Sequence, residues 1–311
     1  MLKANKVICG DSLQEIKTIQ DNTIHLILSD IPYGIAIEAW DVLHNNRNTA
    51  LRGASPAQAK TTLFKSRGKP LNGWSAADKT IPSDYYIWCK SWAKDWLRVL
   101  TPGASCFIFA GRRLAHRCIS ALEDSGFIFK DMLSWQKQAA PHRAQHVSSV
   151  FKRRDDFNNA EKWDGWKLGN LRPLFEPILW FMKPYKCGET LTDTILYNNV
   201  GGYNEHFIKD NKLENIGLEI GSNIIKCKVE ATDRGLHPTQ KPVQLMEYLI
   251  GLTTVASQIV LDPFCGCGST LLAAKNLSRR YIGIEKERYY YEIISKRLET
   301  SDALTMASDK K

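Results

Sequence analysis

Short apolar runs that stop at loops containing aspartate, proline or glycine occur near both ends of the chain. Residues 24–29 form one such run, Ile-His-Leu-Ile-Leu-Ser, which stops at Asp30. Residues 258–261 and 280–284 form two more, and an acidic residue follows each of them. Runs of this length bounded by turns are typical of buried parallel strands. The pattern therefore predicts a sheet whose strand ends carry polar side chains.

Helical periodicity appears between the predicted strands. Residues 84–98 carry aromatic side chains three and four positions apart, which predicts a helix with Trp88, Trp92 and Trp96 in the core. Further helices are predicted at 112–124, 270–277 and 287–299, and further strands at 104–109, 127–135 and 176–182. This alternation predicts an α/β fold with a doubly wound, mostly parallel sheet, in which ligands bind beyond the carboxyl ends of the strands.

Positive charge is concentrated in two stretches that lack this periodicity. The chain holds 42 Lys and Arg against 33 Asp and Glu, a net charge of +9. Residues 41–70 contribute +5 and residues 137–154 another +5, so the rest of the chain is close to neutral. Residues 41–82 predict a long loop or insertion, and residues 137–172 an irregular basic segment. Such a charge distribution favours a polyanionic partner.

The composition predicts the cellular compartment and argues against a metal site. No apolar run approaches the roughly 18 to 20 residues of a membrane span, and the N-terminal segment lacks the apolar region of a signal peptide. These features predict a cytoplasmic protein with no membrane partner, whose eight cysteines are reduced. Cys265 and Cys267 lie too close together for ordinary zinc spacing, and the sequence offers no second Cys/His pair nearby, so no metal is expected.

The loop after residues 258–261 indicates a nucleoside-containing cofactor. Residues 262–269 read Asp-Pro-Phe-Cys-Gly-Cys-Gly-Ser. Gly266 and Gly268 would let the backbone approach a ligand, and Glu285 at the end of the next strand is placed to accept ribose hydroxyls. The loop has neither the third glycine of a dinucleotide fingerprint nor the Gly-Lys pair of a phosphate loop. The alternative is that its glycines only form a tight turn.

Asp30-Ile-Pro-Tyr33, after the first strand, is the second element with candidate chemistry. The Asp30 carboxylate can accept a hydrogen bond from an exocyclic amine, a backbone carbonyl of the turn can accept another, and Tyr33 offers a flat face to a base. The alternative is an ordinary β-turn with an aspartate cap and a packed tyrosine.

These segments resemble the motifs of the amino-group DNA methyltransferases. Residues 30–34 resemble motif IV and residues 262–270 resemble motif I, the S-adenosylmethionine loop. Residues 237–242 are similar to motif X, residues 10–12 to motif III and residues 176–183 to motif VIII. A catalytic motif before the cofactor loop is the order of the circularly permuted β class. The resemblance covers somewhat over half of the chain.

The resemblance implies transfer of a methyl group from S-adenosyl-L-methionine to N6 of a flipped-out adenine in a specific DNA sequence. Asp30 matches the adenine-N6 enzymes better than the cytosine-N4 enzymes, whereas Ile31 departs from the family's proline. Cytosine-N4 methylation stays open as an alternative. So do methylation of RNA or of a protein glutamine, and a nucleic-acid-binding module with an inactive cofactor site.

Site residues follow from these motifs and from the basic stretches. The predicted catalytic residues are Asp30, Ile31, Pro32 and Tyr33. The predicted cofactor-binding residues are Asp11, Asp30, His237, Thr239, Gln240, Lys241, Asp262, Pro263, Phe264, Cys265, Gly266, Gly268, Ser269, Glu285 and Lys286. The predicted DNA contacts are Arg47, Arg52, Lys65, Arg67, Lys137, Arg143, Lys152, Arg153 and Arg154.

The chain is accordingly divided into six segments. Base reading is assigned to residues 185–235, where Asn198, Asn199 and Asn204 are available. The resemblance implies that the partner is double-stranded DNA, and it also makes a homodimer an expectation. The segments are 1–40 (catalytic motif), 41–82 (basic insertion), 83–184 (rest of the catalytic subdomain, with the basic loop 137–172), 185–235 (target recognition), 236–300 (cofactor binding) and 301–311 (tail).

Overall fold

The computed structural model describes residues 4–34, 49–51, 66–70, 74–138, 140, 144–207, 216–217, 221–229 and 235–308. The strands are β1 (Lys6–Cys9), β2 (Ile24–Asp30), β3 (Thr49–Leu51), β4 (Ser66–Pro70), β5 (Leu100–Phe109), β6 (Ile128–Gln136), β7 (Gln145–His146), β8 (Lys167–Leu168), β9 (Phe175–Met182), β10 (Ile216–Gly217), β11 (Ile224–Cys227), β12 (Ile259–Asp262) and β13 (Arg280–Glu285). The helices are α1 (Ser12–Glu15), α3 (Ala76–Val99), α4 (Ala115–Glu123), α5 (Val147–Lys152), α6 (Phe157–Lys162), α7 (Leu191–Asn198), α9 (Val243–Thr253), α10 (Ser269–Asn276) and α11 (Arg288–Ser308).

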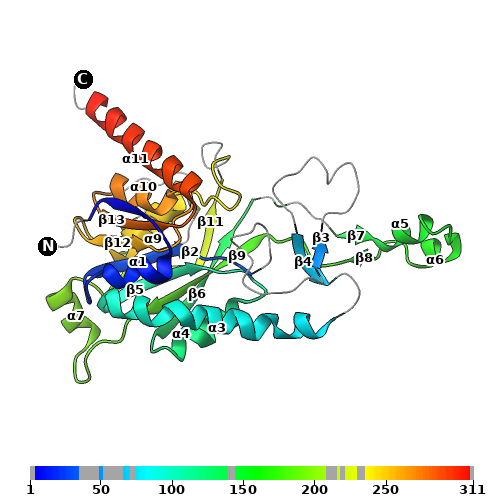
Figure 1. Ribbon diagram of the computed structural model, residues 1–311, viewed down its shortest axis with the longest axis horizontal. Coiled ribbons are helices and arrows are strands. Elements are labelled where there is room, and N and C mark those ends of the chain that lie inside the picture. The colour runs from blue at the N-terminus through cyan, green and yellow to red at the C-terminus, as the bar shows by residue number, and fades with distance from the viewer. Residues whose placement is uncertain are drawn as a thin grey trace.

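A sheet with the strand order β1-β13-β12-β2-β5-β9-β6-β11-β10 forms the centre of the molecule (Figure 1). The strands from β1 to β5 in this order pair in parallel, whereas β9 runs antiparallel to both β5 and β6. The predicted α/β fold with a mostly parallel sheet is therefore confirmed. Because β2 and β12 are neighbours, the loops after Asp30 and Asp262 leave the sheet side by side at one edge.

Two hydrophobic clusters, one on each face of the sheet, hold the helices in place. Ile27 of β2 packs in one cluster with Trp92 and Trp96 of α3, and all three side chains are buried. Leu28, the next residue of β2, belongs to the cluster on the other face, together with Leu249 of α9. Successive residues of a strand point to opposite faces, so β2 anchors both layers of helices. Trp92 and Trp96 are confirmed as core residues.

Helix α3 begins earlier than the sequence pattern predicted. Residues 76–82 belong to this helix, so the prediction placed the end of the loop over 41–82 too late in the chain. Ser75 and Asp78 form a capping box, in which the Asp78 carboxylate accepts from the Ser75 N–H at 2.9 Å and the Ser75 hydroxyl accepts from the Asp78 N–H. This Ser-x-x-Asp spacing is the sequence signal that identifies the start. The rest of the predicted loop lies largely outside the described residues.

Residues 144–172, here called the arm, are more ordered than predicted. The arm projects from the sheet between β6 and β9, with α5 and α6 at its far end (Figure 1). Its two sides are joined by the antiparallel pair of β7 and β8. The expectation of an irregular segment at 137–172 is therefore wrong for the arm, because both short helices and the strand pair form there.

Helix α9 is a further element that the sequence pattern did not predict. Its residues are apolar on most sides because it is buried among the sheet and α10. The segment 185–235 contains α7, β10 and β11, and its remaining residues include stretches outside the described part. None of the helices described in this structure is long and apolar enough to cross a membrane.

Gly251 of α9 supports a test of how tightly this layer is packed. A Cβ at Gly251 would lie 2.0–2.2 Å from three ring carbons of Phe207. Alanine usually favours a helix over glycine by about 1 kcal/mol, but overpacking costs about 1–3 kcal/mol. We therefore expect Gly251→Ala to lower the free energy of unfolding, measured by urea titration. Adding Phe207→Leu should restore part of the loss, and a stabilised single variant would contradict this packing.

Candidate active site

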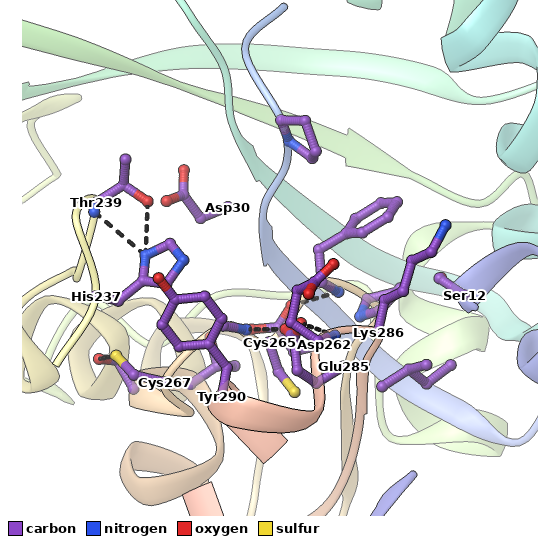
Figure 2. Close-up of a pocket in the computed structure, with 18 of the residues that line it drawn as sticks. Ser12, Asp30, His237, Thr239, Asp262, Cys265, Cys267, Glu285, Lys286 and Tyr290 are labelled. Atoms are coloured by element: carbon purple, nitrogen blue, oxygen red, sulfur yellow. Dashed lines mark hydrogen bonds between the residues drawn. The ribbon is translucent and has the colours of Figure 1, made fainter. Parts of the chain in front are cut away.

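A cavity of about 570 Å³ lies at the carboxyl ends of β2, β12 and β13 (Figure 2). All of the predicted catalytic and cofactor-binding residues line it except Ile31, Tyr33 and Gly268. The motifs from the two ends of the chain therefore meet at one place. Sequence reasoning missed Trp88 and Tyr290, which also line the cavity. Both belong to helical aromatic patterns, which do not distinguish a residue of the core from one at a cavity wall.

The two glycines of the loop after β12 have different tasks. Gly266 lines the cavity with a φ of +52° and lies beside the ring of His237. Gly268 has a φ of +78° and forms the N-cap of α10, where a Cβ would lie 2.9 Å from Ile294. Gly268 does not line the cavity, and its conformation serves the strand-to-helix turn.

Asp262 ends β12 as a buried carboxylate in the cavity wall. Its Oδ1 accepts hydrogen bonds from the Ser29 hydroxyl at 2.7 Å and from the Phe264 N–H at 3.2 Å. Burial raises the pKa of Asp262 to about 6, although the hydrogen bond from Ser29 lowers it. A positively charged ligand in the cavity would favour the ionised form of this carboxylate.

Glu285 ends the neighbouring strand β13 and lies against the glycine loop. Its two carboxylate oxygens accept from the backbone N–H groups of Gly266 and Glu287, each at 2.8 Å. Burial raises the pKa of Glu285 to about 7 despite these bonds. The backbone contacts fix the orientation of the carboxylate, and each oxygen has a second lone pair that can accept from a ribose hydroxyl.

His237 forms an uncharged part of the cavity wall. Its Nδ1 lies 3.2 Å from the Thr239 N–H, and its ring meets Tyr290 edge-on at 4.5 Å between centroids (Figure 2). Burial, together with the positive charge of Lys241, lowers the pKa of His237 to about 4. Among the described residues, no group of three His, Cys, Asp or Glu side chains is arranged to hold a metal ion.

An aromatic wall and one unpaired hydroxyl complete the cavity. The rings of Trp88 and Phe264 lie 5.9 Å apart between centroids, and both residues line the cavity. The Ser12 hydroxyl, also in the wall, is buried and finds no hydrogen-bond partner within the described part of the chain. Flat apolar surface beside an unsatisfied polar atom suits a heterocycle with a polar edge.

Packing against the core fixes the turn that begins at Asp30. Ile31, which stands where the family has proline, is buried in the core. The Tyr85 hydroxyl donates to the Pro32 carbonyl at 3.1 Å. Gly34 adopts a φ of +66°, and a Cβ there would lie 2.9 Å from the Tyr85 ring. The turn therefore survives the change from proline to isoleucine, because core packing and Tyr85 hold its backbone.

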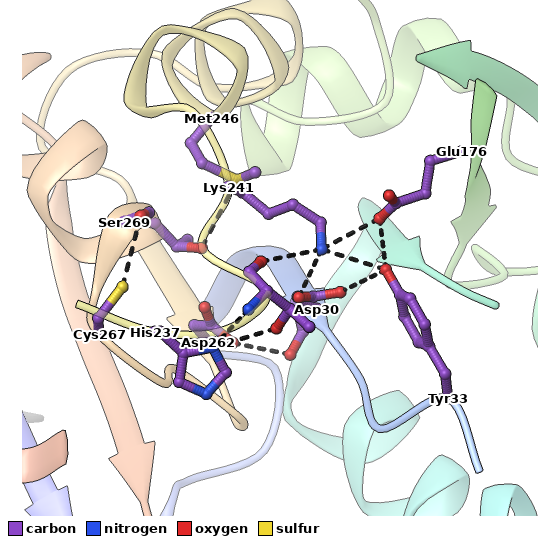
Figure 3. Close-up of polar contacts among 12 residues, drawn as sticks. Asp30, Tyr33, Glu176, His237, Lys241, Met246, Asp262, Cys267 and Ser269 are labelled. Atoms are coloured by element: carbon purple, nitrogen blue, oxygen red, sulfur yellow. Dashed lines mark hydrogen bonds and ion pairs between the residues drawn. The ribbon is translucent and has the colours of Figure 1, made fainter. Parts of the chain in front are cut away.

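A buried network of charged groups surrounds this turn (Figure 3). The Lys241 ammonium lies 2.5 Å from Asp30 Oδ2 and 3.0 Å from Glu176 Oε1. The Tyr33 hydroxyl lies 2.8 Å from Asp30 Oδ1 and also contacts Glu176. Although burial opposes both charges, the two lysines lower the pKa of Glu176 to about 2, and the carboxylates raise the pKa of Lys241.

Sequence reasoning missed Glu176 and placed Lys241 only in the cofactor set. Lys241 does line the cavity, but its ammonium lies at the catalytic turn. Glu176 is the acidic residue of the otherwise apolar strand β9, inside the segment that resembles motif VIII. An acidic side chain in a buried strand is the signal that could have identified it, because such a group needs a charged partner.

The predicted DNA contacts divide into three groups. Arg47, Arg52, Lys65 and Arg143 lie outside the described residues, and only the backbone of Arg67 is described. Lys152, Arg153 and Arg154 are exposed on the arm. Lys137 instead pairs with Glu176, with its Nζ 2.5 Å from Oε2, so it supports the buried network.

The three asparagines expected to read bases are not near the cavity. Asn198 donates to the Pro102 carbonyl at 3.2 Å, close to the amino end of β5. Asn199 ends α7 with a φ of 55°, and the Asn204 N–H donates to the carbonyl of Leu252. They lie at the edge of the sheet opposite to Asp30, so their assignment to base reading is corrected. Their polar groups serve turns and helix ends.

Comparison with known proteins gives one consistent family. A family model described as DNA methylase, and named for N6 and N4 methyltransferases, matches residues 24–296. The type II methyltransferase M.HindIII of Haemophilus influenzae is 56% identical over 289 residues, which cover 93% of this chain and 93% of that protein. M.HinfI of the same species is 24% identical over 298 residues, which cover 94% of this chain and 68% of that protein.

Solved structures share the fold at low sequence identity. The cytosine-N4-specific PvuII DNA methyltransferase has a TM-score of 0.56 at 16% identity, covering 95% of this chain and 86% of that chain. TTHA0409 of Thermus thermophilus, complexed with S-adenosyl-L-methionine, has a TM-score of 0.56 at 16% identity, covering 94% of this chain and 92% of that chain.

Asp262 gives a pH-dependent prediction. Between its unfolded pKa of 3.8 and its folded pKa of about 6, the folded chain keeps a proton that the unfolded chain has lost. The free energy of unfolding therefore falls as pH rises through this window. Asp262→Asn removes this dependence and keeps an acceptor for Ser29. We expect the variant to gain about 3 kcal/mol on the wild type between about pH 4 and pH 7 in urea titrations.

Asp11→Asn is the matched control, because Asp11 lies nearby and its shift has the opposite sign. The Lys286 ammonium lowers the pKa of Asp11. The Asp11 variant should therefore lose stability relative to the wild type as pH rises. A difference between Asp262→Asn and the wild type that does not change with pH would contradict the buried, proton-binding state of Asp262.

Proposed function

The chain belongs to the DNA methylase family of N6 and N4 amino-group methyltransferases, and we propose that its target is the N6 amino group of adenine. It is a DNA methyltransferase whose cofactor is S-adenosyl-L-methionine. The observation that carries the choice of adenine is Asp30, an acidic first residue of the turn at the cavity. This residue resembles the first residue of the adenine-N6 enzymes, and a carboxylate is a pure acceptor for an amine.

The residues of the cavity fit S-adenosyl-L-methionine. Two buried carboxylates, Asp262 and Glu285, have raised pKa values, so a cation beside them is favourable. We assign the ribose hydroxyls to Glu285, the adenine ring to the wall of Trp88 and Phe264, and the methionine part to the loop around His237. The cofactor supplies a methyl group on a positively charged sulfur.

Asp30 and the backbone of the turn hold the amino group of the target. Asp30 accepts one N–H, and we assign the second N–H to the Ile31 carbonyl, since the Pro32 carbonyl already accepts from Tyr85. Two acceptors direct the nitrogen lone pair out of the plane of the base, towards the methyl donor. The rate enhancement then comes from positioning and from the negative charge that faces a nitrogen becoming positive.

The target base must leave the double helix to reach this turn. Asp30 lies in the wall of the cavity, and a base that is still stacked in the duplex cannot enter that cavity. We therefore infer that the base flips out. The Tyr33 hydroxyl is held by the buried network, which fixes the ring in one orientation. We propose that this ring face receives the flipped base, a contact of about 1–3 kcal/mol in comparable stacking sites.

The arm is the described surface that we assign to the DNA backbone. It projects from the sheet and carries exposed Lys152, Arg153 and Arg154 (Figure 1). Its length would let it follow the duplex while the target base occupies the cavity. We propose that residues within 185–235 other than Asn198, Asn199 and Asn204 read the bases.

The biological setting follows from the relatives. We propose that the chain is the modification enzyme of a type II restriction-modification system, because M.HindIII is a type II methyltransferase. It would then act in the cytoplasm, where bacterial DNA lies. A homodimer is proposed from the family resemblance, and light scattering coupled to gel filtration tests it.

Asp30→Ala should remove methyl transfer and leave cofactor binding in place. We expect the rate of tritiated methyl transfer to duplex DNA to fall by about 10³ or more, because an electrostatic contact made in the transition state is lost. Calorimetric titration with S-adenosyl-L-methionine should still show saturable binding. Asp21→Ala, which breaks an exposed ion pair with Arg98, is the control and should keep full activity. Full activity in Asp30→Ala would contradict the assignment.

The modified base is identified by digesting the methylated DNA to nucleosides and by long-read sequencing of DNA from cells that express the chain. We expect N6-methyladenine at one recognition sequence. N4-methylcytosine would overturn the choice of adenine and keep the family. Wild-type chain that binds the cofactor without transferring a methyl group to DNA would overturn the proposed activity.

Neutralising the arm should weaken DNA binding and its dependence on salt. The triple variant Lys152→Gln/Arg153→Gln/Arg154→Gln should reduce the slope of log K against log salt by about 0.9 for each charge that contacts a phosphate. The matched control changes three exposed lysines outside the arm to glutamine, Lys17, Lys94 and Lys296. An equal change of slope in both variants would mean that the arm acts only through net charge.

A further inference from the structure

Both oxygens of the Asp30 carboxylate already lie within hydrogen-bond distance of protein donors. Oδ1 lies 2.8 Å from the Tyr33 hydroxyl, and Oδ2 lies 2.5 Å from the Lys241 ammonium. Asp30 also lines the cavity, and its side chain is 19% exposed. Each oxygen keeps a second lone pair, but an amino group that approaches Asp30 must share the carboxylate with these donors, and the charged donor on Oδ2 competes most strongly.

The Lys241 ammonium is shared between two carboxylates. Its Nζ lies 2.5 Å from Asp30 Oδ2, 3.0 Å from Glu176 Oε1, 3.1 Å from the Tyr33 hydroxyl and 3.2 Å from the Thr239 carbonyl (Figure 3). An ammonium has three hydrogens, so these four acceptors exceed what it can serve at one time. Lys241 can give up Asp30 and still donate three hydrogen bonds.

Glu176 is placed to keep the ammonium when Asp30 releases it. It lies on β9, its side chain is 11% exposed, and it does not line the cavity. Its other oxygen, Oε2, is held by Lys137 at 2.5 Å, which fixes the carboxylate in position. Two lysines and two carboxylates balance in charge, so a shift of Lys241 towards Glu176 leaves no isolated buried cation.

We propose that Lys241 occupies the place of the target amino group on Asp30 in the free enzyme, and that Glu176 is the positioning residue that takes the ammonium when the base enters. This inference rests on the proposed methyl transfer to an amine held by Asp30. The N–H of the base then replaces the N–H of Lys241 on the same oxygen. Glu176 acts through Lys241 and does not touch the substrate.

The exchange also removes an electrostatic obstacle to transfer. The amino nitrogen gains positive charge as it takes the methyl group, and a neighbouring ammonium on Asp30 Oδ2 would oppose that charge. With Lys241 on Glu176, the Asp30 carboxylate faces the nitrogen alone. In the free enzyme, Lys241 keeps the buried Asp30 compensated, since a carboxylate in a low-dielectric site needs a partner.

The kinetic test compares Glu176→Gln in two backgrounds. We expect Glu176→Gln alone to raise KM for unmethylated duplex plasmid about tenfold, because Lys241 then leaves Asp30 less readily when the base enters. The value of kcat should change less than threefold, because the bound base still displaces Lys241 from Asp30. In a Lys241→Met background, the same Glu176→Gln change should leave KM unaltered, since no ammonium remains to be moved. A wild-type KM in Glu176→Gln, or an equal rise in both backgrounds, would overturn the proposal.

Controls separate this effect from loss of the fold or of the activity itself. Glu123→Gln, on the exposed face of α4, should match the wild type. Glu176→Asp keeps the charge at a shorter reach and should give an intermediate KM. Methyl transfer by the wild type is measured in the same assay, so failure of the proposed function appears there and not in the comparison of variants.

A structure of the wild type tests the proposal without any substitution. The complex would hold sinefungin and a duplex that contains the mapped site. With the target base against Asp30, Lys241 Nζ should lie within hydrogen-bond distance of Glu176 and more than about 4 Å from Asp30 Oδ2. An ammonium that still contacts Asp30 Oδ2 in that complex would overturn the proposal.

Discussion

The pairing of β2 with β12 is the contact on which the whole site depends. The Ser29 hydroxyl donates to Asp262 across this pair, and the two residues are 233 positions apart in the chain. Parallel neighbours deliver their carboxyl ends to the same edge, so the catalytic turn and the cofactor loop must open side by side. Both hydrophobic clusters use β2, which holds this geometry from both faces of the sheet.

Electrostatics divides the cavity into two regions of different character. In the cofactor region, burial leaves Asp262 and Glu285 with raised pKa values, so this region is suited to a cationic ligand. Around the catalytic turn, Lys241 and Lys137 lower the pKa of Glu176 to about 2, whereas burial raises the pKa of Asp30 although Lys241 opposes this shift. The cofactor region therefore gains its positive charge from the ligand, while the catalytic turn has the positive charge of its own lysines.

The sequence supported the parts of the site that depend on local pattern. Apolar runs ending at Asp30, Asp262 and Glu285 predicted the correct strand ends, because strand polarity fixes where such residues appear. The contact of Lys241 with Asp30 and Glu176 could not be predicted, since it joins three segments by tertiary packing. Asn198 shows the converse limit: a base-reading side-chain type says nothing about the edge of the sheet on which it lies.

The distance between β2 and β12 along the chain has a consequence for biosynthesis. β2 pairs with β5 and β12, and a ribosome completes the catalytic turn long before it makes β12 and Lys241. Until then, an apolar strand destined for the centre of the sheet has an open edge, which is a template for unwanted association. An incomplete chain carries the turn without its cavity. The chain can therefore modify DNA only after the last third of the polypeptide has folded onto the first third.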